Sequence, residues 1–329
     1  MKQLEQIRTI GIAGAGLMGA SMAQIFAMRG YPVILYDNSP EGLERGKQLI
    51  KDSQEKYIQM GKLDEKSSQE IVGRIFLTME KKDFVVIDFL VECIFEKMEV
   101  KHQFWGEVSD IVSTDAVLTT NTSGLSITEI AKAVKGPERF AGMHWVNPPH
   151  LVPLVEVIAG DETASETLDV VKEVALAIHR KPIMVEKDVN GFVLNRLQYA
   201  LLREAFYIVE SGIASMEDVD NVMKYGLGMR YAAIGPFETV DLGGVDTFYN
   251  VSSYLLGSLC NSTQVPKLLE ERYKAGAYGT KTRRGLYDYP GDAALEKVRK
   301  RDEDFMKLAE CLFGEETKRT EEIEKAGGS

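Results

Sequence analysis

Histidine and glutamate are well suited to moving a proton, and one such pair stands out by its surroundings. His144 directly follows the apolar run RFAGM, and Glu156, twelve positions later, lies inside a second apolar run, LVPLVEVIA. A carboxylate inside such a run is costly to bury unless it is paired. If the two runs are neighbouring strands joined by a turn over residues 147–153, Glu156 lies beside the imidazole, fixes its tautomer and stabilises its protonated form. That arrangement is suited to general acid–base catalysis on an alcohol.

A structural reading of the same pair is open as well. On spacing alone, a His–Glu pair that merely closes the sheet carries about half the weight. The other three histidines give no comparable signal: His150 lies in a turn after two prolines, and His102 and His179 have no carboxylate in a similar setting. We expect none of these three to be catalytic.

Small polar residues follow another predicted strand, AVLTT. Asn121 and Ser123 come directly after it, at the carboxyl edge where ligands bind in open α/β sheets. Their side chains are suited to hold a nicotinamide or a substrate carbonyl, or to cap the helix that starts near Ser126. Asn195, in the segment NGFVLNR, opens the first helix of the second predicted domain. There it either reaches a ligand cleft or ties a hinge.

A glycine motif near the N-terminus predicts a nucleotide site. Residues 14–19 read GAGLMG, a GxGxxG between a predicted strand and a predicted helix, and a second strand ends at Asp37. Such glycines let the backbone turn tightly and approach a pyrophosphate, which lies on the N-terminus of the helix. An acidic residue at the end of the second strand binds the adenosine ribose and repels a 2′-phosphate, so the sequence predicts NAD rather than NADP. The alternative is a glycine turn with no ligand.

The positions of these residues require a particular arrangement of elements. Apolar runs predict strands that alternate with helical patterns over about the first 185 residues, which favours a doubly wound, mostly parallel Rossmann-type sheet. A charged, helix-favouring segment over residues 41–75, broken near Gly61, predicts an inserted helical hairpin. Beyond Lys187 the patterns are helical. We therefore predict an α/β domain over residues 1–187 and a mainly α-helical domain over residues 188–329. The predicted strands are 8–13, 32–36, 84–92, 116–120, 139–144 and 154–159, and the predicted second-domain helices are 192–211, 216–225, 239–260, 266–275 and 293–312.

Composition excludes several other classes. The formal net charge of −11 argues against nucleic-acid binding, which needs a basic surface. No apolar run reaches the roughly 18 residues of a membrane span, and the N-terminus has no signal-peptide core. Cys93, Cys260 and Cys311 are widely spaced without a metal-binding pattern, as in a reducing compartment. We expect a cytoplasmic protein without a bound metal.

Seven segments in order resemble the 3-hydroxyacyl-CoA dehydrogenase family over nearly the whole chain. They are GIAGAGLMGASMA, VECIFEKMEVK, TNTSGLSI, RFAGMHWVNPPHLVPLVEV, NGFVLNRL, IGPFETVDLGGVD and GTKTRRGLYDY. The resemblance implies a Rossmann-type NAD domain, a helical second domain that forms a homodimer, and NAD-dependent oxidation of an L-3-hydroxyacyl compound. For a short-chain coenzyme A thioester such as 3-hydroxybutyryl-CoA, it implies a place in fatty acid metabolism.

The resemblance also implies roles for residues at matching positions. His144 is the implied general base, Glu156 holds and polarises it, and Ser123 and Asn195 bind the substrate oxygen and reacting group. Glu96 and Lys101 are implied contacts of the nicotinamide ribose. The implied NAD site as a whole comprises Gly14, Gly16, Leu17, Met18, Gly19, Asp37, Glu96, Lys101 and Asn121.

Departures from the family pattern leave the substrate open. Trp145-Val146 replaces the usual two phenylalanines, and several segments are more similar to the branch of λ-crystallin, L-gulonate 3-dehydrogenase and carnitine dehydrogenases, which oxidise free hydroxy acids. Arg230, in GLGMRYAAIGP, could clamp a free carboxylate, or be a surface or interface arginine. We predict a CoA thioester as the first candidate for the substrate and a free hydroxy acid as the second. A non-catalytic, crystallin-like NAD-binding protein is a remote third, since His144, Glu156, Ser123 and Asn195 are all present.

Overall fold

The computed structural model describes the backbone of residues 1–327 and the side chains as far as Gly314. The chain divides into two compact units, Met1–Asn195 and Arg196–Ser329, which are described separately below. The boundary predicted between residues 187 and 188 stays a prediction.

The first unit is built on one eight-stranded sheet in the order β3-β2-β1-β4-β5-β6-β7-β8. Neighbouring strands run parallel except β6 and β7, which are antiparallel. This is the mostly parallel Rossmann-type sheet predicted from the alternating pattern, and the predicted fold class is confirmed. The strands are β1 (Ile10–Ala13), β2 (Val33–Tyr36), β3 (Ile75–Thr78), β4 (Phe89–Glu92), β5 (Val117–Thr120), β6 (Phe140–Trp145), β7 (Leu154–Ile158) and β8 (Lys181–Val185).

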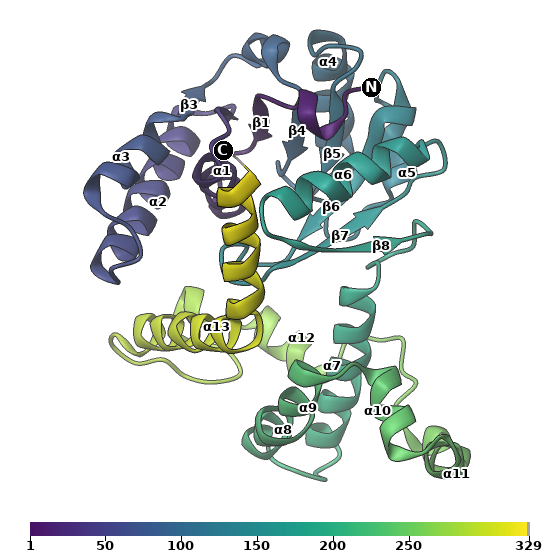
Figure 1. Cartoon of the computed structure of the whole chain (residues 1–329). Coiled ribbons are helices and arrows are strands. Elements are labelled where there is room, and N and C mark those ends of the chain that lie inside the picture. Colours follow the sequence, from purple (N-terminus) through teal and green to yellow (C-terminus); the bar gives the residue numbers. More distant parts are fainter. Residues whose placement is uncertain (328–329) are drawn as a thin grey trace. The chain divides into compact units, whose positions relative to one another are not determined.

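Helices cover both faces of this sheet, which is why its central strands β1, β4 and β5 are buried along their whole length (Figure 1). One core cluster joins the sheet to α1 and α6, and the other joins it to α4 and α5. The helices of the unit are α1 (Leu17–Met28), α2 (Pro40–Gln59), α3 (Glu65–Gly73), α4 (Met98–Ile111), α5 (Ile127–Ala131) and α6 (Ser165–Ala177), with short 3-10 turns at Leu4–Gln6, Lys81–Val86 and Pro137–Arg139.

Three details of the first unit differ from the sequence prediction. Strand β3 was missed, because its four residues lie at the sheet edge, where only Thr78 is buried, and carry little alternation. The predicted strand over residues 84–92 begins only at Phe89, since residues as far as Val86 form a 3-10 turn. Strand β8 was not assigned either. The helical hairpin of α2 and α3, in contrast, turns around Gly61 as predicted.

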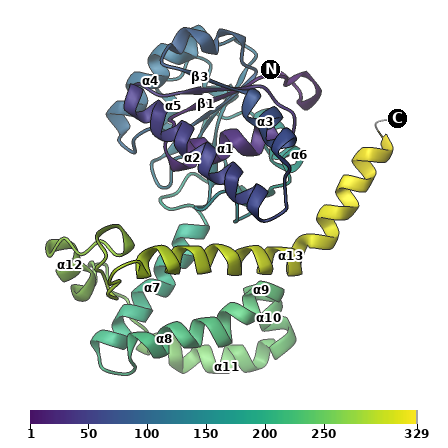
Figure 2. The same cartoon turned by 90° about the vertical axis from the view of Figure 1, so that its left-hand side faces the viewer.

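The second unit is mainly helical over the part of it that the structure describes (Figure 2). The helix predicted over residues 239–260 is two helices, because Gly244 at φ +92° ends one and begins the next. Among the described residues, no helix is long and apolar enough to cross a membrane. The helices are α7 (Leu194–Glu210, beginning in the first unit), α8 (Met216–Val222), a π-helical turn (Met223–Leu227), α9 (Gly228–Ala233), α10 (Pro236–Gly243), α11 (Val245–Leu255), a 3-10 turn (Leu256–Ser258), α12 (Lys267–Lys274), a 3-10 turn (Thr280–Thr282) and α13 (Ala293–Gly327).

Candidate active site

The antiparallel pairing of β6 and β7 brings His144 and Glu156 together. The two residues are direct partners in the register of the strands. The imidazole Nδ1 lies 2.7 Å from Oε2 of Glu156. His144 is 5% exposed and Glu156 is fully buried, so this contact is shielded from water. Because a carboxylate can only accept, the proton between them belongs to Nδ1, which leaves Nε2 as the free acceptor of a neutral ring.

The second carboxylate oxygen of Glu156 binds the first turn of α7. Oε1 accepts the backbone N–H groups of Val193 and Leu194 at 2.9 and 2.8 Å. Burial acts to raise the pKa of Glu156, but the hydrogen bonds from His144 and from these two amides outweigh it and hold the pKa below its ordinary value. The carboxylate therefore stays charged beside the imidazole.

Two aromatic residues lie next to His144, Phe192 in space and Trp145 in the sequence, and only the first contacts its ring. The ring of Phe192, a residue with φ +50°, packs against the imidazole with centroids 5.6 Å apart. Trp145 lies on the opposite face of the sheet, in the core beside Phe26 of α1, with the guanidinium of Arg180 over its ring. The departure from the family pattern at Trp145 is thus accommodated in the core, and that side chain does not share the face of His144.

The loop after β5 is held at several points. The side-chain amide of Asn195 donates to the carbonyl oxygen of Ser123 at 2.8 Å, so the structure brings these two predicted site residues together. Asn121 uses its side-chain oxygen to accept the backbone N–H of Trp145 at 2.7 Å. In this structure Asn121 and Asn195 therefore position backbone.

The glycine turn fits a dinucleotide. A Cβ on Gly19 would lie 1.7 Å from the carbonyl oxygen of Gly14, and Gly14 itself has φ +104°, so neither position accepts a side chain. A Cβ on Gly16 would meet nothing within 4 Å, which leaves open space at the N-terminus of α1, where Leu17 and Met18 begin the helix. That open space above unpaired amides is what a pyrophosphate requires.

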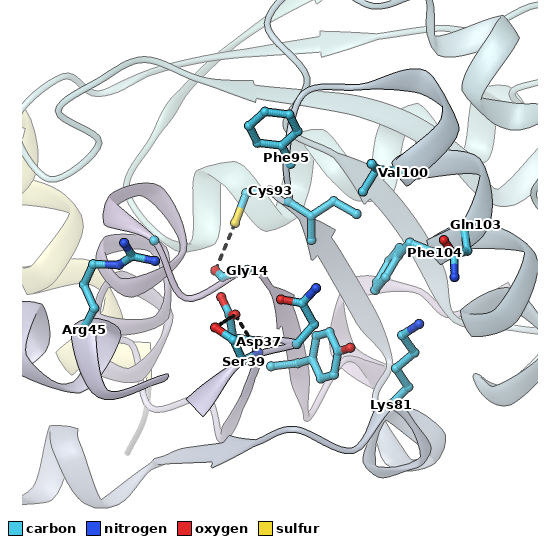
Figure 3. A pocket seen from close by; sticks show the side chains of 14 residues that line it. Gly14, Asp37, Ser39, Arg45, Lys81, Cys93, Phe95, Val100, Gln103 and Phe104 are labelled. Atoms are coloured by element: carbon cyan, nitrogen blue, oxygen red, sulfur yellow. Dashed lines mark hydrogen bonds between the residues drawn. The ribbon is translucent and has the colours of Figure 1, made fainter. Parts of the chain in front are cut away.

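Asp37 lies beside this turn in a cavity of about 510 Å³ (Figure 3). Its carboxylate accepts the N–H of Ala15 at 2.9 Å and both the N–H and the hydroxyl of Ser39 at 3.1 and 3.3 Å. Arg45 of α2 also lines the cavity, and it was not singled out from the sequence. The lining residues are Gly14, Gly16, Tyr36, Asp37, Asn38, Ser39, Arg45, Lys81, Cys93, Ile94, Phe95, Val100, Gln103 and Phe104.

Lys101 and Glu96 are linked to a third charged residue that the sequence reading passed over. The Lys101 ammonium lies 2.5 Å from Glu92 and 3.3 Å from Glu96. Glu92 ends β4 and is fully buried. The signal was available, because Glu92 closes the apolar run FVVIDFLVE in the same manner as Glu156 lies within its own run.

Arg230 lies on α9 of the second unit, where its side chain is exposed. Its role as a carboxylate clamp stays a prediction, as do the roles of the other predicted site residues.

The fold and the glycine cradle define the class of this protein as a dinucleotide-binding one. The profile of the 3-hydroxyacyl-CoA dehydrogenase NAD-binding domain matches residues 9–189, and that of the family's C-terminal domain matches residues 191–289. The chain therefore belongs to the 3-hydroxyacyl-CoA dehydrogenase family, whose members act on a CH–OH group with NAD.

Individual relatives differ in their substrates. A 5-formyl-3-hydroxy-2-methylpyridine 4-carboxylate 5-dehydrogenase of Mesorhizobium japonicum is 33% identical over 94% of this chain and 100% of its own. A probable 3-hydroxybutyryl-CoA dehydrogenase of Deinococcus radiodurans is 37% identical over 85% of this chain and 99% of its own. A crystal structure of a 5-formyl-3-hydroxy-2-methylpyridine 4-carboxylic acid 5-dehydrogenase, an NAD⁺-dependent dismutase, is similar with a TM-score of 0.87 at 33% identity, over 94% of this chain and 99% of that one.

Two alanine substitutions in the glycine turn are expected to have different effects, one on stability and the other on NAD binding. Gly19→Ala forces a methyl group against the Gly14 carbonyl and should lower the free energy of unfolding without cofactor by about 1–3 kcal/mol. Gly16→Ala meets no protein atom and should leave that free energy within about 0.5 kcal/mol, while the dissociation constant for NAD rises about 10-fold or more. Urea unfolding and calorimetric titration with NAD measure the two effects. Equal loss of stability in both variants would contradict the description of the cradle.

Glu156 should make stability depend on pH in acid. Because its pKa in the folded protein lies below the ordinary 4.5, its contribution is complete above that pH and is lost as the pH falls through the lowered value. We expect Glu156→Gln to lower the free energy of unfolding by about 1–3 kcal/mol at pH 7, and the difference from wild type to shrink below pH 4.5. Urea unfolding over pH 3–7 measures it, with Glu173→Gln on exposed α6 surface as the control. A pH-independent difference would rule out this linkage.

Proposed function

We propose that this chain oxidises the 3-hydroxyl of a 3-hydroxyacyl compound to the 3-keto product, reversibly, with His144 as the general base. The observation that carries the proposal is the contact of His144 Nδ1 with Glu156 at 2.7 Å. It fixes the tautomer in which Nε2 can take a proton, and it places a charged carboxylate where an imidazolium forms.

The residues of the chain then divide the work. His144 accepts the proton of the substrate hydroxyl, and Glu156 stabilises the resulting positive charge on the ring. Ser123 binds the substrate oxygen, and Asn195, which holds the carbonyl of Ser123, binds the reacting group. NAD, when bound, supplies the acceptor for the hydride from C3.

The cofactor is held by three parts of the first unit. Gly14, Gly16 and Gly19, with Leu17 and Met18 at the start of α1, hold the pyrophosphate, and Asp37 holds the adenosine ribose. By resemblance to the family, Glu96, Lys101 and Asn121 belong to the nicotinamide end of the site.

For the substrate we propose first a short-chain CoA thioester such as 3-hydroxybutyryl-CoA. This choice is supported by the 37% identity to a probable 3-hydroxybutyryl-CoA dehydrogenase, and it would place the enzyme in fatty acid metabolism. The second candidate is a small free acid, because the match to a dehydrogenase of a pyridine carboxylate extends over 94% of this chain rather than 85%. Arg230 is the proposed clamp for such a carboxylate. Membership of the λ-crystallin branch stays a prediction, as does location in the cytoplasm.

We also propose a homodimer formed through the second unit. This unit exposes an unusual number of large apolar side chains, among them Phe237, Tyr225, Leu242 and Met229, each 74% or more exposed. Apolar surface of this extent is typical of an interface between subunits. Sedimentation at micromolar concentration should give twice the mass of one chain, and a monomer there would contradict the proposal.

His144→Gln should lower kcat about 10²- to 10⁴-fold, because the amide cannot accept the proton, while the dissociation constant for NAD changes little. Steady-state oxidation of 3-hydroxybutyryl-CoA and of free hydroxy acids, with calorimetric titration of NAD, provides both quantities. His150→Gln in the adjacent turn serves as the control and should keep the wild-type rate. Near-normal turnover by His144→Gln would overturn the mechanism.

A panel of CoA thioesters and free hydroxy acids should separate the two substrate classes. If a free acid is the substrate, Arg230→Ala should lower kcat/KM for it about 10-fold or more, because a charge-assisted pair with the carboxylate is lost. Lys224→Ala, an exposed cation of the same unit, is the matched control. If only thioesters are turned over, and Arg230→Ala does not change their rate, the proposed role of Arg230 in binding a carboxylate is wrong.

A further inference from the structure

The end of β4 holds a buried carboxylate whose oxygens are fully engaged. Glu92 accepts from the N–H of Ile94 at 2.9 Å and from the ammonium of Lys101 at 2.5 Å on one oxygen. On the other it accepts from the indole of Trp105 at 3.3 Å and the hydroxyl of Thr120 at 2.7 Å. These four donors come from the loop after β4, from α4 and from β5, so Glu92 holds its own strand end in place against α4 and β5.

Lys101, which Glu92 holds in place, also forms an ion pair with a second carboxylate, that of Glu96. Its ammonium also lies 3.3 Å from Glu96, and its side chain is only 1% exposed, whereas that of Glu96 is 44% exposed. A ligand at this edge of the sheet therefore meets Glu96 before it can meet Lys101. Glu92, Lys101 and Glu96 together are called the charge chain below.

Glu96 ends the charge chain at the loop that carries Ser123. Its Oε1 accepts the hydroxyl of Thr122 at 2.5 Å and the backbone N–H of Ser123 at 2.8 Å. The same Thr122 oxygen accepts the N–H of Leu125 at 3.0 Å, which closes the loop on itself. The backbone of Ser123 is thus held by Glu96 through its N–H and by Asn195 through its carbonyl.

The energetics of buried charges indicate what the charge chain contributes. Two ions taken out of water lose hydration that their mutual attraction only partly restores, so such a pair adds little stability over an apolar pair. What it provides is a fixed orientation of the side chains, because the ammonium and the carboxylates hold each other in place. Stability alone does not account for Glu92 and Lys101.

We propose that Lys101 is a positioning residue for Ser123, anchored by Glu92 and acting through Glu96. The proposal rests on the proposed function for the role of Ser123 in binding substrate. The position of the loop itself is independent of any activity.

The test compares variants in the absence of cofactor and substrate. Lys101→Met leaves Glu92 buried without its cation and can fail to fold. The pair Glu92→Gln with Lys101→Met removes both buried charges, and Glu96→Gln changes only a half-exposed side chain. We expect the pair and Glu96→Gln to speed hydrogen exchange of the amides of residues 123–125 roughly 10-fold, with the amides of β4 and β5 unchanged. Lys97→Met, an exposed lysine before α4, is the control and should leave exchange unchanged.

Turnover provides a second readout. At saturating NAD and substrate, the Glu92→Gln, Lys101→Met pair should lower kcat about 10- to 100-fold, as expected for a misplaced binding group. Unchanged loop exchange without NAD, combined with weaker NAD binding, would mean that Lys101 acts through the cofactor alone and would overturn the proposal. Exchange that rises equally in β4 and β5 would reduce the charge chain to core packing and overturn it too. If wild type turns over none of the substrates, the proposed function fails, and the exchange measurement still decides the position of the loop.

Discussion

The first unit depends on one constraint, that a carboxylate buried at a strand must find a partner for each of its oxygens. Glu156 satisfies it with one oxygen on His144 and the other on the first turn of α7. One side chain therefore sets the orientation of the imidazole and the position at which α7 begins. Because α7 begins at Leu194, the same contact also fixes the position of Asn195, the next residue of the helix. Glu156 therefore positions both His144, the proposed base, and Asn195, which holds Ser123.

Much of this arrangement could be predicted from the sequence because it depends on local pattern. Apolar runs predicted the parallel sheet, and a glutamate within one of them predicted a partner for His144. The same argument applied to Glu92 would have found the second buried carboxylate. It was passed over because its partners lie on α4 (Lys101 and Trp105) and on β5 (Thr120), and the sequence does not show that these two segments meet at Glu92.

Other features could not be predicted because tertiary contacts decide them. Strand β3 pairs on one side only, and its sequence carries little of the alternation that marks a half-buried strand. The face on which Trp145 lies follows from the two-residue period of β6, which places it opposite His144 once the strand is known. The sequence departure at Trp145 therefore bears on packing against α1 and not on the residues around the base.

The end of β4 connects the cofactor cradle with the loop of Ser123. On one side of Glu92, Cys93 donates its thiol hydrogen to the carbonyls of Ala13 and Gly14, and burial raises the pKa of this thiol, which keeps the proton in place. On the other side, Glu92 binds Thr120 of β5 and, through Lys101, reaches Glu96. Since β4 lies between β1 and β5, two adjacent residues fix both the glycine turn and the Ser123 loop. The groups that hold NAD and those proposed to hold the substrate are thus positioned from one strand end, and a shift of that strand end would displace both together.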